Sequence, residues 1–152
     1  MPNTITELDR VVTLADQDLK AARKAMRQAA PEVPDTVEAQ TALGLAYMAL
    51  EQPRDAARAY KRAVELDPSD PLPRFHLGAY QTDMGLLPQG EENLRVAVAS
   101  EPENAEYQAA LAFNFYKANR RTEARIAFEA AVAAGSEDDD VFASLGYLYY
   151  FE

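Results

Sequence analysis

Residues 37–70 read VEAQTALGLAYMALEQPRDAARAYKRAVELDPSD, and this stretch decides the fold because its pattern recurs along the chain. A Leu-Gly or Leu-Ala pair returns every 34 residues, at Leu43-Gly44, Leu77-Gly78, Leu111-Ala112 and Leu145-Gly146. After each of the first three pairs come a small residue, a large apolar residue and a second small residue, which in the first unit are Ala56, Tyr60 and Ala63. A fixed period of this length indicates a protein built from stacked helical or strand repeats.

The spacings of three and four within each unit place its apolar residues on one stripe of a helix, so each unit reads as two amphipathic helices. The pattern predicts helices at 37–50 and 54–66, at 71–84 and 88–100, at 105–118 and 122–134, and a lone helix that begins near Asp139. Asp35, Ser69 and Thr122 are the expected N-caps, since their side chains can accept hydrogen bonds from free backbone N–H groups. No segment alternates in the manner of a strand, and the sequence therefore predicts an all-α fold.

The first 36 residues follow the pattern only in part. A step of 34 residues back from the first full unit leads to Ala22, Met26, Ala29 and Pro34, which predicts the second helix of a further unit. The first helix of that unit is out of register by one residue, and the shift places Leu8 and Val12 on the packing face. Because the end repeats of a solenoid are often atypical, residues 5–34 are interpreted as a degenerate leading repeat or cap.

These units resemble the tetratricopeptide repeat (TPR) family. Residues 37–70 carry its pattern as Leu43, Gly44, Tyr47, Ala56, Tyr60, Ala63 and Pro68, and residues 105–138 carry it as Leu111, Ala112, Phe115, Ala124, Phe128 and Ala131. Residues 71–104 depart from it at Gln81, where an aromatic is usual, and at Gly90, where Ala is usual. The resemblance implies that residues 1–152 form a single domain, a right-handed α-solenoid of stacked antiparallel helix pairs. Its parts would be the leading repeat, three full repeats (37–70, 71–104 and 105–138) and a half repeat at 139–152.

The resemblance also implies a concave groove built mainly from the first helix of each pair. Its expected partner-binding residues are Leu45, Met48, Leu72, Phe75, Phe113, Tyr116, Tyr147 and Tyr150. Apolar side chains of this kind suit a protein or peptide partner with hydrophobic anchors, and the predicted function is that of an interaction scaffold or a chaperone-like module. One branch of the family clamps a C-terminal carboxylate with Lys, Arg and Asn, but the corresponding positions here hold Thr41, Leu45, His76 and Ala110. The alternative is that the groove is filled by the protein's own N-terminal helix or by a neighbouring copy.

The composition argues against several classes of function. The net charge of −10 opposes nucleic-acid binding, and no run of about 18 apolar residues is present to span a membrane. The chain has no Cys and one His, His76, and the acidic run 137–140 lacks the Gly of a calcium loop, so no metal, cofactor or enzymatic activity is expected. The start carries no signal-peptide pattern, which favours a cytoplasmic location; a periplasmic one would require that a signal peptide has been removed.

The last eleven residues, FASLGYLYYFE at 142–152, are expected to be the first helix of a further unit whose second helix is absent. Leu145 and Tyr149 should then pack on the helix at 122–134, while Tyr147, Tyr150 and Phe151 would extend the groove or remain exposed. Two explanations stay open for this apolar end. The chain is a scaffold or regulatory fragment of a longer protein, such as an enzyme or an export component, or helix 139–152 is covered by another copy in a homo-oligomer.

Overall fold

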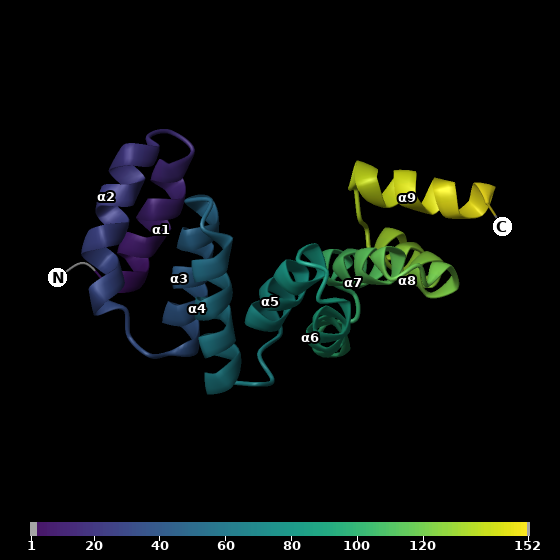
Figure 1. The fold of residues 1–152 in the computed structure, drawn as a ribbon, viewed down its shortest axis with the longest axis horizontal. Coiled ribbons are helices and arrows are strands. Elements are labelled where there is room, and N and C mark those ends of the chain that lie inside the picture. Colours follow the sequence, from purple (N-terminus) through teal and green to yellow (C-terminus); the bar gives the residue numbers. More distant parts are fainter. Residues whose placement is uncertain (1–2, 152) are drawn as a thin grey trace. The chain divides into compact units, whose positions relative to one another are not determined.

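The computed structural model describes residues 3–151, and within that range the chain is all-α, as predicted. The helices are α1 (Thr4–Ala15), α2 (Leu19–Ala29), α3 (Val37–Ala49), α4 (Pro53–Leu66), α5 (Pro71–Asp83), α6 (Leu87–Ser100), α7 (Ala105–Lys117), α8 (Arg121–Ala133) and α9 (Asp139–Tyr150), with a 3-10 turn, η1, at Ala30–Glu32 (Figure 1). They group into two compact units, Met1–Pro73 and Arg74–Glu152. None of these helices is both long and apolar enough to cross a membrane.

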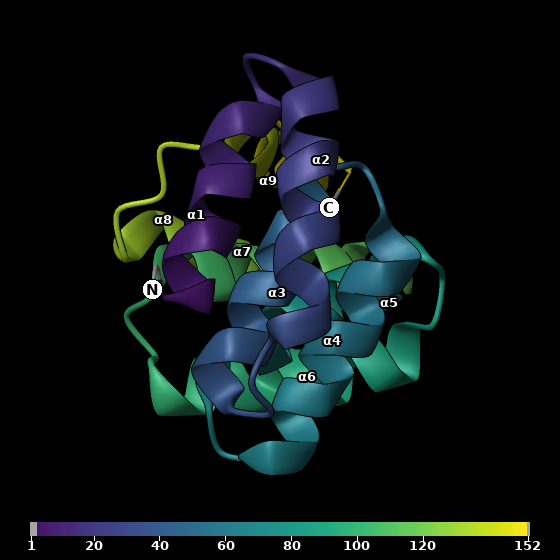
Figure 2. The same cartoon turned by 90° about the vertical axis from the view of Figure 1, so that its left-hand side faces the viewer.

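In the first unit, α1 packs on α2 and on α3, and α3 packs on α4. Figure 2 turns α1 and α2 toward the viewer, side by side, so the leading residues do form a helix pair. Leu8 is buried as expected, but Val11 shares the core with it and Val12 is exposed, so the predicted register was wrong by one residue. Leu8 and Val11 lie three residues apart, which places them on one helical face.

The packing of α3 on α4 explains the glycine at position 44. A Cβ built on Gly44 would lie 2.3 Å from Cε1 of Tyr60, closer than two carbon atoms can approach. Tyr60 is 1% exposed and lies between Ala56 and Ala63, both fully buried. Small residues therefore let the two backbones approach, and the Tyr60 ring fills the space between them.

All three predicted N-caps were wrong. Thr36, not Asp35, caps α3, since its Oγ1 accepts from the N–H of Ala39 at 3.3 Å, while the Asp35 carboxylate pairs with Arg62. The N–H of Leu72 donates to Asp70 Oδ1 at 3.0 Å at the start of α5, and Ser69 itself donates to Asp67. The residue before α8 is Arg120, without a side-chain cap, because Thr122 already lies in the first turn. A cap must have extended backbone, which the sequence alone locates only to within a residue or two.

In the second unit, α6 packs on α7, α7 on α8 and α8 on α9. The core is formed largely by Leu94, Leu111, Phe115 and Phe128 with the alanines of α8 around them. Both departures from the repeat pattern in residues 71–104 have a structural reason. A Cβ on Gly90 would lie 2.6 Å from Oγ1 of Thr82, and Gln81 accepts a hydrogen bond from Asn93 at 2.8 Å in place of an aromatic contact.

Helix α9 packs through one face only. Val141 and Leu148 are buried against the rest of the unit, and Leu145 packs partly against the same core. The prediction for Tyr149 was correct only for its hydroxyl group, which donates to Glu129 of α8 at 2.6 Å while the residue remains 52% exposed. Positions 141 and 148 correspond to Ala39 and Ala46 of α3, which are also fully buried. α9 therefore uses the face that turns toward the preceding repeat, and its other face is open.

Candidate functional site

A groove of about 330 Å³ lies between α5 and α7, the first helices of two neighbouring repeats in the second unit. Its lining residues are Phe75, Ala79, Thr82, Asp83, Glu106, Ala109, Ala110, Phe113, Lys117 and Asp138. Most of the surface between the charged ends is apolar, and a cavity of this size lies at the lower limit for small-ligand sites. It can therefore hold one or two apolar side chains.

The repeat period explains how the groove arises. Phe75 of α5 and Ala109 of α7 occupy the same repeat position, and so do Ala79 of α5 and Phe113 of α7. Each helix therefore contributes one large and one small side chain to the lining. The space that the alanines leave open is the groove.

Aromatic contacts hold the two phenylalanines in place. The Phe75 ring packs on Tyr107 with centroids 4.9 Å apart, and the Phe113 ring meets Phe128 edge-on at 5.0 Å. Phe75 is only 7% exposed, so it belongs to the core as much as to the groove. Phe113 is partly buried and gives the groove its more accessible ring.

The two ends of the groove differ in charge. At one end Lys117 Nζ and Asp83 Oδ1 are 2.6 Å apart and neutralise each other. At the other end lie the carboxylates of Glu106, in the first turn of α7, and Asp138, the N-cap of α9. Glu106 lies on a first helix, the kind of helix that was expected to build the groove, whereas Asp138 was missed because it lies in a loop that only the packing of α9 brings to the groove.

The predicted residues Tyr116, Tyr147 and Tyr150 lie elsewhere in the second unit, in what we call the aromatic row, together with Phe151. Tyr116 meets Tyr147 at a centroid distance of 6.2 Å, Tyr147 meets Phe151 at 4.6 Å, and Phe151 meets Tyr150 at 4.8 Å. All four are exposed, Tyr150 most of all at 82%. These residues form a separate apolar surface on α7 and α9.

The remaining predicted residues are Leu45 and Met48 on α3 and Leu72 in the first turn of α5. All three are exposed, with 38%, 47% and 41% of their surface accessible, and none of them lines the α5–α7 groove. Their role in partner binding stays a prediction.

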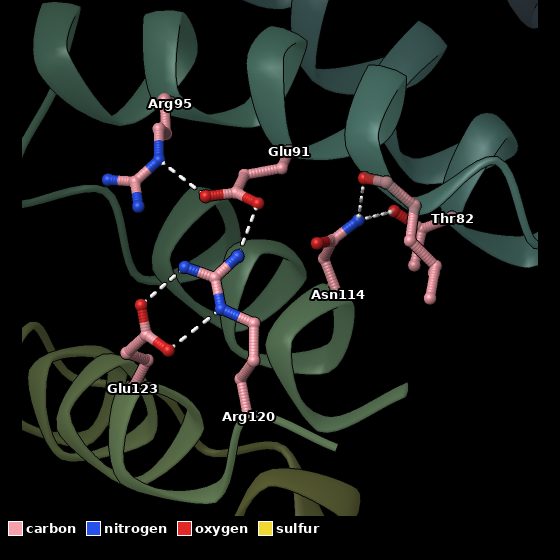
Figure 3. Close-up of polar contacts among 7 residues, drawn as sticks. Thr82, Glu91, Arg95, Asn114, Arg120 and Glu123 are labelled. Atoms are coloured by element: carbon pink, nitrogen blue, oxygen red, sulfur yellow. Dashed lines mark hydrogen bonds and ion pairs between the residues drawn. The ribbon is translucent and has the colours of Figure 1, made fainter. Parts of the chain in front are cut away.

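A polar network fixes α7 against α6 and α8 behind the groove (Figure 3). Arg120 binds Glu91 of α6 at 2.5 Å and Glu123 of α8, and its guanidinium lies 4.6 Å above the Phe115 ring. Partial burial would raise the pKa of Glu91, but hydrogen bonds from Arg95 and Arg120 lower it below its usual range. The network therefore stays ionised near neutral pH and holds α7 against α6 and α8.

A buried amide completes this support. Asn114 of α7 is fully buried and its Nδ2 donates to Thr82 Oγ1 at 2.8 Å and to the carbonyl oxygen of Leu87 at 3.0 Å (Figure 3). Thr82 also lines the groove, so these bonds link the α5 side of the groove directly to α7.

The single histidine carries no charge near neutral pH. Burial lowers the pKa of His76 to about 4, so this imidazole is neutral near pH 7. Among residues 3–151, no group of three or more His, Cys, Asp or Glu side chains is placed to hold a metal ion.

The comparison with protein families matches residues 37–70 to the family described as tetratricopeptide repeat. A comparison with curated protein sequences finds no match. The family match confirms the resemblance that the Leu-Gly, Tyr and Ala positions of this repeat indicated.

Several solved structures are similar over most of the chain. MamA from Desulfovibrio magneticus RS-1, residues 41 to the end, has 16% identity and a TM-score of 0.79, with 99% of this chain and 86% of that chain covered. PilF from Pseudomonas aeruginosa has 17% identity and a TM-score of 0.77, with 95% and 68% covered. The first TPR of Spaghetti (RPAP3), bound to the HSP90 peptide SRMEEVD, has 13% identity and a TM-score of 0.70, with 76% and 91% covered. At these identities the likeness concerns the fold, and it confirms the predicted α-solenoid class.

Proposed function

We propose that this chain, which contains a tetratricopeptide repeat at residues 37–70 and has the TPR fold, is a protein-interaction module that holds an apolar side chain of a partner in the α5–α7 groove. The observation that carries the proposal is the groove itself, which is lined by two phenylalanines and three alanines and has a volume of about 330 Å³. The RPAP3 repeat, which has a similar fold, binds a peptide, and this supports the same class of function here.

The energetics favour a short anchor. Burying one Leu or Phe side chain of a partner contributes about 1.5 to 3 kcal/mol when it is fully covered. Phe75 and Phe113 are already held by ring contacts, so closing around an anchor costs little side-chain entropy. A micromolar affinity corresponds to about 8 kcal/mol, so about three to five such anchors are needed. The exposed side chains of Leu45, Met48 and Leu72 and the aromatic row are the surfaces that we propose for the additional anchors.

Filling the groove tests this function. We would select peptides from a random displayed library against the whole chain and measure the affinity of the best ones by fluorescence anisotropy. Ala79→Leu places three extra carbon atoms in the groove and should weaken a groove-bound peptide at least tenfold. Ala133→Leu makes the same change at an exposed position of α8 and should have no effect.

Circular dichroism of both variants would show that the helices are intact. If Ala79→Leu binds the selected peptides as tightly as the original chain does, the groove is not the binding site. If no peptide with an apolar anchor is selected at all, the proposed function fails.

A second candidate function, self-association through α9, is favoured by one observation. This helix and the residue after it expose Phe142, Tyr147, Tyr149, Tyr150 and Phe151 to solvent. Sedimentation velocity between about 1 and 100 μM should then show a concentration-dependent dimer, which Phe142→Lys with Tyr150→Lys should abolish. A chain that sediments as a monomer over the whole range would rule it out.

We also propose that the protein has no catalytic activity and that it is located in the cytoplasm. The neutral His76 and the absence of cysteine from the sequence are compatible with both statements. Fractionation of cells that express the tagged protein tests the location.

A further inference from the structure

We infer that the α5–α7 groove selects partner segments in which the apolar anchor stands next to a lysine or arginine. This inference rests on the proposed function, because it names the chemistry of the segment that the groove binds. Three carboxylates and one ammonium group line the groove, which gives the lining a net charge of −2. The charges are unevenly placed, and their placement carries the argument.

The Lys117 end of the groove has little attraction left for a ligand. Lys117 Nζ lies 2.6 Å from Asp83 Oδ1, so an acidic ligand would have to compete with a carboxylate already in contact. A basic ligand group would be repelled by Lys117 to the same extent as it is attracted by Asp83. This end is therefore close to neutral for a ligand.

The opposite end keeps two carboxylates available. Glu106 lies in the first turn of α7, but it does not cap that helix, because Asn104 Oδ1 already accepts from the N–H groups of Glu106 and Tyr107 at 3.1 and 3.2 Å. Asp138 uses Oδ1 to accept from the N–H of Asp140 at 2.8 Å, which leaves its second oxygen. Neither carboxylate takes part in an ion pair among the described residues.

The distance from these carboxylates to the apolar part of the groove suits a neighbouring residue of the ligand. Glu106 precedes Ala109 and Ala110 by three and four residues, which is one helical turn, or about 5 Å along α7. Consecutive residues of an extended peptide are about 3.3 to 3.6 Å apart. A Lys or Arg one or two positions from the anchor therefore reaches Glu106 and Asp138 while the anchor lies between Phe75 and Phe113.

The charge of the whole chain acts in the same direction. At −10 it attracts basic segments from a distance and repels acidic ones, an effect that salt weakens. The peptide SRMEEVD bound by the RPAP3 repeat contains three acidic residues, and the α5–α7 groove is expected to reject a segment of that charge.

The experiment uses four fluorescein-labelled peptides and the full chain. Three octapeptides share a central Leu-Phe and differ only in the two flanking residues, which are Lys, Gln or Glu; the fourth peptide is SRMEEVD. Anisotropy at 50 mM NaCl should rank them Lys above Gln above Glu, with about three- to tenfold between neighbours, as expected for two solvent-exposed ion pairs. SRMEEVD should bind no better than the Glu peptide. The preference for Lys over Gln should fall by half or more at 300 mM NaCl.

A double variant locates the preference. Glu106→Gln with Asp138→Asn removes both charges, and Asn remains a good N-cap for α9. It should reduce the preference for Lys over Gln to less than twofold. Glu92→Gln with Glu103→Gln removes the same net charge at two exposed positions outside the groove and should preserve the preference.

The outcomes separate the two proposals. Equal binding of the Lys, Gln and Glu peptides overturns the charge preference and leaves the hydrophobic groove standing. A preference that the Glu92/Glu103 pair abolishes and the Glu106/Asp138 pair does not overturns the assignment to this groove. Tighter binding of the Glu peptide or of SRMEEVD overturns the inference directly, and binding of none of the four overturns the proposed function with it.

Discussion

Gly44 in α3 and Gly146 in α9 occupy the same position of the repeat, yet their surroundings are opposite. A Cβ on Gly44 would lie 2.3 Å from the Tyr60 ring, and one on Gly78 would lie 2.8 Å from Leu94 Cγ. A Cβ on Gly146 would have no neighbour within 4 Å. At Gly44 and Gly78 the second helix of the pair leaves no room for a Cβ, whereas α9 has the pattern of a first helix without such a neighbour among the described residues.

The burial of the faces of α3 and α9 differs in the same way. In α3 the residues that meet α4 and those that meet α1 are both covered. In α9 only Val141 and Leu148 are buried, whereas Phe142, Gly146 and Tyr149 are exposed. Equal sequence patterns therefore predict equal helices, but not equal contributions of their residues to stability.

The largest expected effect concerns the aromatic ring of the complete pair. Tyr60→Ala should lower the free energy of unfolding by about 3 to 5 kcal/mol, because it leaves a cavity at a site that is 1% exposed. Tyr149→Ala, on the open face of α9, should cost less than about 1 kcal/mol. Urea unfolding followed by circular dichroism measures both. Similar losses for the two variants would show that α9 is covered in solution.

The next effect concerns the buried face of α9. Leu148→Ala should weaken the docking of α9 by about 2 kcal/mol, near the lower limit for buried leucines, since the end of the helix can relax. Because α9 packs mainly on α8, hydrogen exchange should lose protection in α9 while α3 and α4 keep theirs. Loss of protection in both regions would mean that the two units unfold together.

The two glycines give smaller effects of opposite sign. Gly44→Ala should destabilise the protein by about 1 to 2 kcal/mol, because overpacking against the buried Tyr60 ring exceeds the gain in helix propensity. Gly146→Ala should stabilise α9 by up to about 1 kcal/mol, since only the propensity term remains. Thermal unfolding of each variant and of the double variant, in which the effects should add, measures this. A destabilising Gly146→Ala would indicate that another helix approaches this face.

The helices were predictable from the sequence because their signal is local. Spacings of three and four residues, repeated every 34, located the full pairs to within one or two residues. The register of α1 was not predictable, because this helix lacks the Leu-Gly pair that aligns the other units. The N-caps were missed for a similar reason, because Asp35 and Thr36 are both suitable cap residues and only the backbone conformation distinguishes them.

The candidate site was predictable only in part. Phe75 and Phe113 were found because first helices carry the inner surface in the TPR family, and both line the groove. The space beside these rings exists because Ala79 and Ala109 are small. It depends on how α5 and α7 pack together, and the pattern of a single helix does not predict that packing. Asp138 and the contact of Tyr116 with Tyr147 depend in the same way on where α9 lies.

The smallest effect concerns the polar contact that holds the open face of α9. The hydrogen bond from Tyr149 to Glu129, followed by that from Arg125, lowers the pKa of Glu129, and the same bond to Glu129 raises the pKa of Tyr149. A lowered native pKa of Glu129 means that its contribution to stability is present above the ordinary glutamate pKa and is lost as the pH falls through the native value. A raised native pKa of Tyr149 means that its contribution is present below the ordinary tyrosine pKa and is lost as the pH rises through the native value.

The contact is therefore expected to hold α9 across the neutral range and to weaken at both extremes of pH. Tyrosine absorbance titrations of the original chain and of Tyr149→Phe should differ by one phenol whose midpoint lies above the ordinary value of about 10. Glu129→Gln should move that midpoint back toward the ordinary value, since it removes the carboxylate that stabilises the neutral phenol. The phenol that Tyr149→Phe removes could instead titrate at the ordinary value in the original chain. That result would mean that Tyr149 does not hold Glu129 in solution. In that case Val141 and Leu148 alone would anchor α9, whereas α3 is held on two faces, by α1 and by α4.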